Sequence, residues 1–504
     1  MERLTYKTID EIGYDGYILK DAPERVLQFG EGNFLRAFTD HFIDVLNEKT
    51  GFNGKVVICQ PRGGAKSKVI NGQDGLYTLL LRGISGGKMT EQMRIISCIS
   101  RCINPVEDFD ELLACASNPN LRFITSNTTE AGIVYDSSCN LSDRPAASFP
   151  AKLTQFLYER YKADLPGFVI LSCELIDRNG DVLLDCVRKH IRQWALPDEF
   201  DAWVQNENSF CSTLVDRIVT GYPKDEAEGL CKKFGYTDEL MDAGEVYASW
   251  VIEGDKKILD ELPFDKADLP VVITDNVDPF KKRKVRMLNG AHTSMSPVAF
   301  MSGIDTVGDC MKDPVISAYV KRALYDEIIP VLGQAEQKGA KEFAEAVYDR
   351  FSNPFIRHEL LSILLNTTAK WKARVLPTIT EYSEEKKALP EMLTFSFAAY
   401  IYLYHHASEL TSEGLAGDRD GKRFVLSDDR KVLELFDSQK DENVIKTADA
   451  IMNSEDLWQG ELLSIDGFTG EVIRDLKLIE EVGMYEAVKR ITAANGGEGH
   501  LEHT

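Results

Sequence analysis

The sequence has no long apolar run and no apolar leader. No stretch of about 18 apolar residues occurs, which excludes an obvious membrane-spanning helix. The first residues, MERLTYKTIDEIG, carry acids where a secretory signal requires an apolar segment. We therefore expect a folded cytoplasmic protein that does not bind membranes.

The C-x-x-C motif is also absent. None of the ten cysteines forms a C-x-x-C pair, and several lie inside apolar runs such as KVVIC and GFVILSC. A secreted disulfide framework would be shorter and richer in cysteine. The pattern predicts buried thiols in a reducing compartment.

Basic residues are fewer than acidic residues. Lys and Arg number 58 against 81 Asp and Glu, a formal net charge of −23. Such a surface repels nucleic acid and anionic membranes over most of its area, so we expect no nucleic-acid partner. An anionic ligand would need a local cluster of basic residues.

The length of 504 residues, with 43% hydrophobic and 28% charged residues, is typical of a globular chain of two or three domains. No internal repeat or low-complexity tract is present. Short apolar runs rich in β-branched residues recur in the first half, with helical patterns at 34–48 and 106–117 between them. These runs lie at 25–29, 55–59, 93–99, 121–126, 168–173 and 270–275.

This alternation predicts a parallel sheet that is covered on both faces, the doubly wound α/β class. After about residue 286 it stops, and apolar residues fall at helical spacing, for example over 314–333 and 341–353. We therefore expect α/β plus α: a doubly wound domain over 1–283 and a mostly helical domain over 284–504. The polar stretch 411–431 is interpreted as a surface excursion between helices.

The first candidate site is the turn Gly30-Glu31-Gly32, which joins a predicted strand to a predicted helix. Gly30 permits a tight turn, and Gly32, which lacks a β-carbon, lets a pyrophosphate approach the helix N-terminus. The third glycine of the dinucleotide fingerprint is replaced by Leu35, although small Ala37 follows. A lone G-x-G is also compatible with an ordinary strand-to-helix turn.

The second half of the dinucleotide fingerprint is missing. The second strand ends Cys59-Gln60-Pro61-Arg62, with no carboxylate for the adenosine ribose. Arg62 is a possible partner for a 2′-phosphate. Spacing alone therefore leaves NAD and NADP open.

The second candidate site is KKRKVRMLNGAHTSMSP at 281–297, the densest positive cluster in the chain. At about 100° per residue from Lys284, His292 falls near 80° and Asn289 near 140°, so the three share one side of a helix. Lysine can serve as acid and base towards a carbonyl, an amide can donate to an oxyanion, and histidine can hold hydroxyls. The alternative is a solvated basic patch.

A third set of polar residues follows predicted strands. Asn127, Thr129 and Glu130 come after 121–126, Arg178 comes after 168–173, and Asp216 lies in STLVDR. Ligand crevices of α/β proteins form at such strand ends. Taken singly, each residue is more typical of a cap or a turn, and Asp216 beside Arg217 is equally compatible with a structural ion pair.

Several motifs resemble those of the polyol-specific long-chain dehydrogenases, the mannitol dehydrogenase family. They are GEGNFLRAF, QDGLYT, SNTTEAGI, SCELIDRNG, STLVDRIVTGYP and the K-x4-N-x2-H pattern at 284–292, in order along the chain. The resemblance implies an N-terminal Rossmann-type domain, a helical C-terminal domain, a cleft between them, NAD as cofactor and no catalytic metal. The expected cofactor-binding residues are Phe29, Gly30, Glu31, Gly32, Asn33, Phe34, Arg62, Asn127, Thr129 and Glu130.

The same resemblance assigns catalytic roles. Lys284 would protonate the carbonyl oxygen as hydride arrives, Asn289 would steady that oxygen, and His292 would position the substrate. Asp216 would belong to the proton network. The family carries an asparagine where this chain has Leu175, so either Asn289 acts with Lys284 alone or a donor such as Arg178 substitutes.

The substrate expected from the closest motifs is an anionic keto sugar acid. Its carboxylate needs a cation, and Lys370 and Arg374 lie four residues apart on one helical face. The alternative is two exposed helix cations. Rival hypotheses are relatives that use a stereoisomeric keto acid or an uncharged ketose, and a non-catalytic nucleotide sensor; a monomer or small homo-oligomer is expected.

Overall fold

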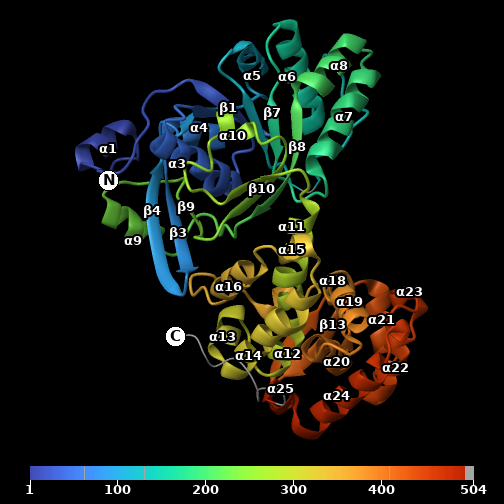
Figure 1. Ribbon diagram of the computed structural model, residues 1–504. Coiled ribbons are helices and arrows are strands. Elements are labelled where there is room, and N and C mark those ends of the chain that lie inside the picture. Colours follow the sequence, from blue (N-terminus) through green and yellow to red (C-terminus); the bar gives the residue numbers. More distant parts are fainter. Residues whose placement is uncertain (62, 130, 408, 494–504) are drawn as a thin grey trace. The chain divides into compact units, whose positions relative to one another are not determined.

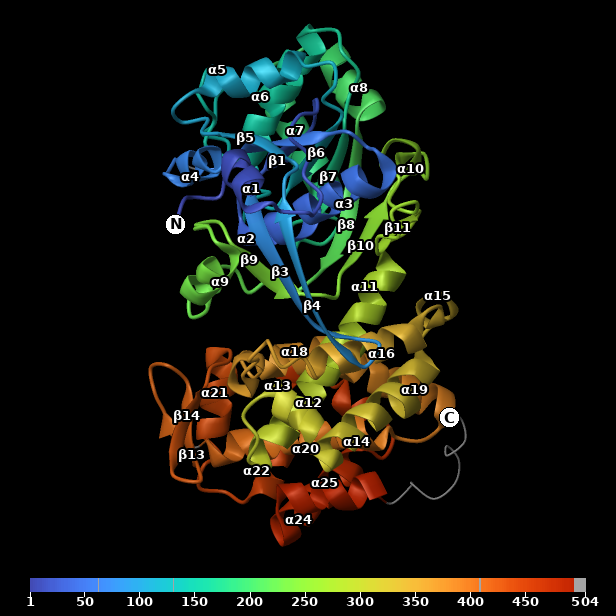
Figure 2. The ribbon, with the colours of Figure 1, turned by 90° about the vertical axis from the view of Figure 1, so that its left-hand side faces the viewer.

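The structure, a computed structural model, describes residues 1–61, 63–129, 131–407 and 409–493. The chain divides into unit 1, Met1–Val277, and unit 2, Asp278–Thr504 (Figures 1 and 2). The boundary expected at 283–284 lies inside helix α11 (Asp278–Lys284). No helix in the described ranges combines the length and the apolar character needed to cross a membrane.

Unit 1 contains an eight-stranded sheet in the order β11-β10-β8-β7-β6-β1-β2-β5. Its strands are β1 (Glu24–Phe29), β2 (Lys55–Cys59), β5 (Ile99–Ile103), β6 (Phe123–Ser126), β7 (Val169–Ser172), β8 (Ser209–Asp216), β10 (Ser249–Glu253) and β11 (Val271–Thr274). The strands from β5 to β8 are all parallel, and β10 runs antiparallel to β8. Numbered along the chain, these six parallel strands have the Rossmann order 3-2-1-4-5-6, with the switch point between β1 and β6.

Helices cover both faces of this sheet, as predicted (Figure 1). On one face, Leu27 and Ile124 pack with α5, α6, α7 and α8; on the other, Val26 and Phe123 pack with α3 and strand β3. The helices of unit 1 are α1 (Tyr6–Ile12), α2 (Asn33–Leu35), π-helix η1 (Arg36–Asp40), α3 (His41–Thr50), α4 (Lys66–Gly72), α5 (Phe109–Ala114), 3-10 helix η2 (Cys115–Ser117), α6 (Phe149–Lys162), α7 (Asn179–Gln193), α8 (Asp198–Glu207), α9 (Ala227–Phe234) and α10 (Ile258–Glu261).

The apolar run 93–99 is two strands rather than one. It contributes the end of β4 (Lys88–Ile96) and the start of β5, and β4 pairs with β3 (Tyr77–Ser85), which also pairs with β9 (Asp242–Glu245) in a second sheet. The break falls at Ser97, whose backbone N–H and hydroxyl both donate to the Asp44 carboxylate. Strand β8 was not predicted because its sequence, SFCSTLVD, mixes polar with apolar residues.

Unit 2 is mostly helical, as predicted. Its helices are α11, π-helix η3 (Val285–Asn289), α12 (Gly290–Met301), α13 (Val307–Lys312), α14 (Pro314–Arg322), π-helix η4 (Ala323–Ile328), 3-10 helix η5 (Ile329–Val331), α15 (Gln334–Gln337), α16 (Ala340–Phe351), α17 (Leu360–Ile363), α18 (Thr367–Arg374), α19 (Leu376–Lys386), α20 (Glu391–His406), α21 (Arg430–Asp437), α22 (Val444–Met452), α23 (Glu455–Trp458), 3-10 helix η6 (Leu462–Ser464), α24 (Phe468–Val482) and α25 (Met484–Ala493). Residues 392–401 of helix α20 are buried on every side of the helix, which is typical of a helix in the centre of a core.

The polar stretch 411–431, predicted as a surface excursion between helices, contains regular strands. It forms strands β13 (Leu415–Arg419) and β14 (Lys422–Leu426), which pair antiparallel and join β12 (Glu409–Leu410) in a small sheet (Figure 2). Leu415, Phe424 and Leu426 from this sheet are part of the helical core. The alternating apolar residues in an otherwise polar sequence are the signal for these strands.

Candidate functional site

The structure gives different reasons for the presence of glycine at the two positions that follow β1. Gly30 has φ +126°, and a β-carbon there would lie 3.0 Å from Leu35 Cδ1 and 3.3 Å from the Asn127 carbonyl oxygen. Gly32 has an ordinary φ of −67°, and no atom lies within 4 Å of a β-carbon built there. The fold therefore requires glycine at position 30 only, while Gly32 leaves open space at the start of the helix.

A cavity of about 450 Å³ lies beside this turn. Its lining includes Phe29 at the end of β1, Thr128 after β6, and Ser148 and Lys152 at the start of α6. The cavity therefore opens at the switch point of the sheet, where α/β proteins bind nucleotides. Sequence reasoning missed Lys152, which is buried and donates to the Pro61 carbonyl at 3.2 Å; burial lowers its pKa.

Three other predicted cofactor-binding residues, Asn33, Phe34 and Asn127, lie in or beside the turn. Asn33 accepts from the Arg36 guanidinium at 2.7 Å, Phe34 stacks on Phe38 with ring centroids 5.0 Å apart, and Asn127 donates to the Cys173 carbonyl at 2.6 Å. Glu31 is half-buried, and Thr129 is exposed with φ +81°. Arg62 and Glu130 lie outside the described residues.

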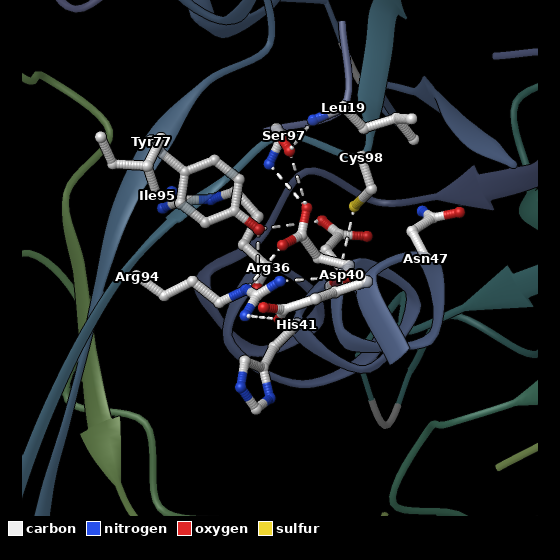
Figure 3. A network of polar contacts seen from close by, with 12 residues as sticks. Leu19, Arg36, Asp40, His41, Asn47, Tyr77, Arg94, Ile95, Ser97 and Cys98 are labelled. Carbon is white, nitrogen blue, oxygen red and sulfur yellow. Dashed lines mark hydrogen bonds and ion pairs between the residues drawn. The ribbon is translucent and has the colours of Figure 1, made fainter. Parts of the chain in front are cut away.

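A buried polar network anchors the helix that follows the glycine turn (Figure 3). Tyr77 on β3 donates to the Arg36 carbonyl at 2.7 Å and also reaches Asp40, and Arg36 pairs with Asp242 at 3.4 Å. One turn on, Asp44 pairs with Arg94 at 2.6 Å. Burial raises the pKa of Asp40 and that of Asp242 to about 7. Because Tyr77, Asp242 and Arg94 lie on β3, β9 and β4, the network fixes the helix after the turn against the second sheet.

Past the end of β7, the polar residues have distinct partners. Buried Glu174 accepts from Ser126 and Thr128, so it ties the ends of β6 and β7 together. Arg178 is exposed and donates to Asp181 at 2.6 Å and Glu253 at 2.8 Å. Leu175 is 66% exposed in the same loop.

Asp216 ends β8 and is buried. Its neighbour Arg217 is also buried, and its guanidinium donates to the backbone carbonyls of Ala37 at 2.6 Å and Tyr247 at 3.0 Å. Burial lowers the pKa of Arg217 to about 10. Arg217 therefore ties the end of β8 to the helix that follows the glycine turn.

In unit 2, Lys284, Asn289 and His292 lie on one continuous run of helix that changes pitch. Lys284 ends α11, Asn289 ends the π-helix η3, and His292 lies in the first turn of α12. In a π-helix the hydrogen bond joins residues five apart, so each residue turns less about the axis and Asn289 lies nearer the face of Lys284 than the 140° of a regular α-helix. Asn289 and His292, three apart, then share that face.

The basic run around Lys284 is largely paired with acids and carbonyls. Arg286 is buried and donates to Thr378 at 2.7 Å and Glu381 at 3.0 Å, and Lys282 lies 3.6 Å from the same Glu381. Arg283 donates to the Lys338 carbonyl. The run is thus integrated into the helical unit and is not simply a solvated patch.

His292 is enclosed by aromatic and cationic side chains. Its ring stacks on Phe351 with centroids 4.0 Å apart and meets His358 edge-on at 5.2 Å. Its Nε2 is buried and has no hydrogen-bond partner within the described part of the chain. Burial, with contributions from His358 and nearby Arg350, lowers the pKa of His292 well below its usual value. This nitrogen is therefore available for a hydrogen bond with a bound molecule or a water.

Lys370 and Arg374 lie on α18 beside this histidine. Arg374 reaches the Thr293 hydroxyl at 3.4 Å, and Lys370 donates to the Ile363 carbonyl at 2.9 Å. Neither forms an ion pair with any carboxylate that the structure describes. Burial lowers the pKa of Arg374, and burial together with Arg374 lowers that of Lys370. Two half-buried cations that form no ion pair with a described carboxylate, in a chain of net charge −23, form a candidate anion site.

His358 and Arg350 complete the surroundings of His292, and sequence reasoning did not select them. His358 precedes α17 and Arg350 lies near the end of α16, so neither has a helical spacing that links it to Lys284 or Lys370. Among the residues described, no group of three or more His, Cys, Asp or Glu side chains is placed to hold a metal ion. All ten cysteines are buried thiols, as predicted.

Comparisons with known proteins cover nearly the whole chain. Residues 24–266 match the mannitol dehydrogenase Rossmann domain, and residues 276–480 match the mannitol dehydrogenase C-terminal domain. The altronate oxidoreductases of Escherichia coli O139:H28 and Shigella flexneri are each 44% identical over 478 residues, 93% of this chain and 96% of theirs.

Two solved structures share the fold. Substrate-free D-sorbitol dehydrogenase aligns with a TM-score of 0.82 at 21% identity, over 96% of this chain and 100% of its own. Mannitol 2-dehydrogenase of Pseudomonas fluorescens, in a ternary complex with NAD and D-mannitol, aligns with a TM-score of 0.67 at 20% identity, over 97% of this chain and 99% of its own. With both domain models and close relatives matched along its length, the chain belongs to the mannitol dehydrogenase family.

Proposed function

We propose that this chain interconverts D-tagaturonate and D-altronate with NAD, in the breakdown of hexuronates in the cytoplasm. The chain is an oxidoreductase acting on CH–OH groups, as its relatives are. The observation that carries the choice of a sugar acid is the pair Lys370 and Arg374, two half-buried cations without carboxylate partners among the described residues, beside His292. An uncharged polyol would form no ion pair with either cation.

The residues of unit 1 fit a dinucleotide. Gly32 leaves room at a helix N-terminus for a pyrophosphate, and the cavity beside Phe29 lies at the switch point of the sheet. Phe29, Asn33, Phe34 and Asn127 surround this turn and would hold the cofactor, which is NAD. When bound, NAD supplies the hydride to the keto carbon or accepts it in the reverse direction.

The protons are handled by the chain's own side chains. Lys284 donates a proton to the carbonyl oxygen during reduction and takes it back during oxidation, as a general acid and base. Asn289, on the same helical face, donates its amide N–H to that oxygen as negative charge develops there. Asp216 belongs to the path by which the proton reaches solvent.

His292 and the two cations position the substrate. His292 offers its unpartnered Nε2 to a substrate hydroxyl, and Lys370 and Arg374 bind the carboxylate. Arg178 would serve as an oxyanion donor only after leaving Asp181 and Glu253. Leu175 has no side-chain donor for the oxyanion, so in this proposal Asn289 supplies that hydrogen bond.

The test follows NADH absorbance with tagaturonate, fructuronate and fructose in parallel, and repeats the best substrate with NADPH and with Lys284→Ala. We expect a clear preference for tagaturonate with NADH. The variant should lose about 100-fold or more in kcat, the usual scale for a general acid. A preference for fructuronate or fructose would reject the substrate, and an unchanged kcat in the variant would reject Lys284 as the acid.

A further inference from the structure

Helix α18, which carries Lys370 and Arg374, begins without a cap of its own. Its N-cap residue, Asn366, has φ +52° and makes no side-chain hydrogen bond to the helix. The first N–H groups of a helix have no partner within the helix, so they need an acceptor from elsewhere. In this unit that acceptor comes from a distant part of the sequence.

Asp428 supplies it. The Thr368 backbone N–H donates to Asp428 Oδ2 at 3.0 Å, and the Thr368 hydroxyl donates to the same oxygen at 2.9 Å. Tyr404 on α20 also donates to this oxygen, at 2.7 Å. One residue earlier, the Ser427 carbonyl accepts from the Asn366 N–H at 2.8 Å.

The position of Asp428 follows from the small sheet of unit 2. Asp428 comes two residues after β14, whose Leu426 is buried in the helical core. Tyr404, its hydroxyl partner, is fully buried on α20, and Tyr400 on the same helix contacts the Thr368 hydroxyl at 2.7 Å. The carboxylate is therefore held from two sides, and it holds the start of α18 against the core.

Asp428 also carries the negative charge that acts on Lys370. Burial and Arg374 lower the pKa of Lys370, whereas Asp428 acts in the opposite direction and favours the charged ammonium. His292, His358 and Arg374 also interact electrostatically with Lys370. A carboxylate at the N-terminus of α18 also interacts favourably with the helix dipole.

We propose that Asp428 is a positioning residue for the substrate: by capping α18 it fixes Lys370 where that lysine binds the substrate carboxylate. This inference rests on the proposed role of Lys370. It also gives a function to the hairpin β13–β14, which places Asp428 beside α18 although 60 residues separate Asp428 from Thr368.

The test compares Asp428→Ala and Asp428→Asn in steady-state kinetics of the full chain. We expect Asp428→Ala to raise the KM for tagaturonate about 10-fold, while kcat and the KM for NADH change less than about twofold. Asp428→Asn should fall between, because its amide oxygen still accepts from Thr368 but the charge is lost. An unchanged KM for tagaturonate in both variants would overturn the proposal.

A matched control separates positioning from general stability. Asp313 caps α14 in the same unit, accepts from the Val315 and Ile316 N–H groups at 2.9 and 3.0 Å, and accepts from the Tyr485 hydroxyl at 3.0 Å. Asp313→Ala should lower the melting temperature without changing the KM for tagaturonate. An equal rise in KM in this control would show that any lost cap acts through stability, and would overturn the proposal.

A double-mutant cycle with Lys370→Ala tests the route of the effect. If Asp428 acts through Lys370, then Asp428→Ala adds little to the KM of Lys370→Ala. Equal fold-changes in both backgrounds would overturn the proposal. If Lys370→Ala alone leaves the KM unchanged, the role of Lys370 fails, and the inference fails with it. Should Asp428→Ala not fold, Thr368→Val removes one donor to Asp428 and should give a smaller rise in KM.

Discussion

Gly30 and Gly32 are two residues apart, yet only one of them is required by the fold. Gly30 has a positive φ and a β-carbon there would be crowded by Leu35, whereas Gly32 faces open space. The sequence pattern G-x-G cannot separate these two reasons, because it records only the residue type. The backbone angle and the surrounding atoms separate them.

This difference predicts that alanine at position 32 weakens cofactor binding, whereas alanine at position 30 lowers the stability of the fold. Gly32→Ala should fold with a near-normal melting temperature but raise the KM for NADH about 10-fold, because its methyl group occupies the space expected for a pyrophosphate. Gly30→Ala should instead lower the free energy of unfolding by about 1–3 kcal/mol. Thermal melts and cofactor kinetics check both. A normal KM for NADH in Gly32→Ala would contradict cofactor binding at this turn.

A second residue-scale prediction concerns the carboxylate. Lys370→Ala should raise the KM for the keto acid about 10-fold or more and leave the KM for NADH nearly unchanged, because a charge-assisted hydrogen bond to the substrate is lost. Lys372 on the same helix is the matched control, since it already pairs with Glu461 at 3.4 Å and donates to the Leu457 carbonyl. Equal, modest changes in both KM values for Lys370→Ala would argue against the carboxylate role.

At the scale of elements, the pitch of one helix decides which residues share a face. Angles of 100° per residue place Asn289 near 140° from Lys284. The π-helix η3 widens one turn by a residue and brings Asn289 closer to the face of Lys284. No residue in VRMLN marks such a turn, so the sequence predicted the shared side but not the alignment.

Asn179 shows how one side chain joins two strands and a helix. Its amide donates to the carbonyls of Ser172, Glu174 and Thr213, and its oxygen accepts from the Thr213 and Gly180 N–H groups at 2.8 and 2.9 Å. Asn179→Ala should therefore lower the free energy of unfolding by about 3 kcal/mol, since it leaves several buried backbone groups unpaired. Urea denaturation measures this. A loss below about 0.5 kcal/mol would show that water replaces the side chain.

For the whole molecule, buried carboxyls set part of the pH dependence of stability. Burial raises the pKa of Glu327 to about 8, although the N–H groups of Met392 and Leu393 donate to it. Because the folded state binds this proton more tightly than the unfolded state, Glu327 stabilises most at low pH. That contribution is lost as pH rises from about 4.5 towards about 8.

We therefore expect the melting temperature of the wild type, relative to that of Glu327→Gln, to fall as pH rises from about 5 to about 8, and to level off above that range. The comparison isolates Glu327, because His41 and His292, whose pKa values are lowered, act equally in both proteins. Calorimetry across this range measures the difference. A difference that grows with pH would contradict the raised pKa.

The sequence by itself determined the class of each half and identified the two motifs on which the proposed function rests. Apolar β-branched runs specify buried strands, and the glycine turn and the Lys284 motif are local in sequence, so short-range pattern suffices to find them. The split of 93–99 into two strands was not visible, because it depends on Asp44, a residue 53 positions from Ser97.

Only the tertiary structure decided which of the described cations form ion pairs. Lys370 and Lys372 look alike in the sequence, yet Lys372 pairs with Glu461 and Lys370 forms no carboxylate ion pair among the described residues. His358 and Asp428 likewise reach α18 and its neighbours through contacts between distant segments. The physical reason is that ion pairing and burial depend on distances between side chains that are far apart along the chain, which local spacing does not encode.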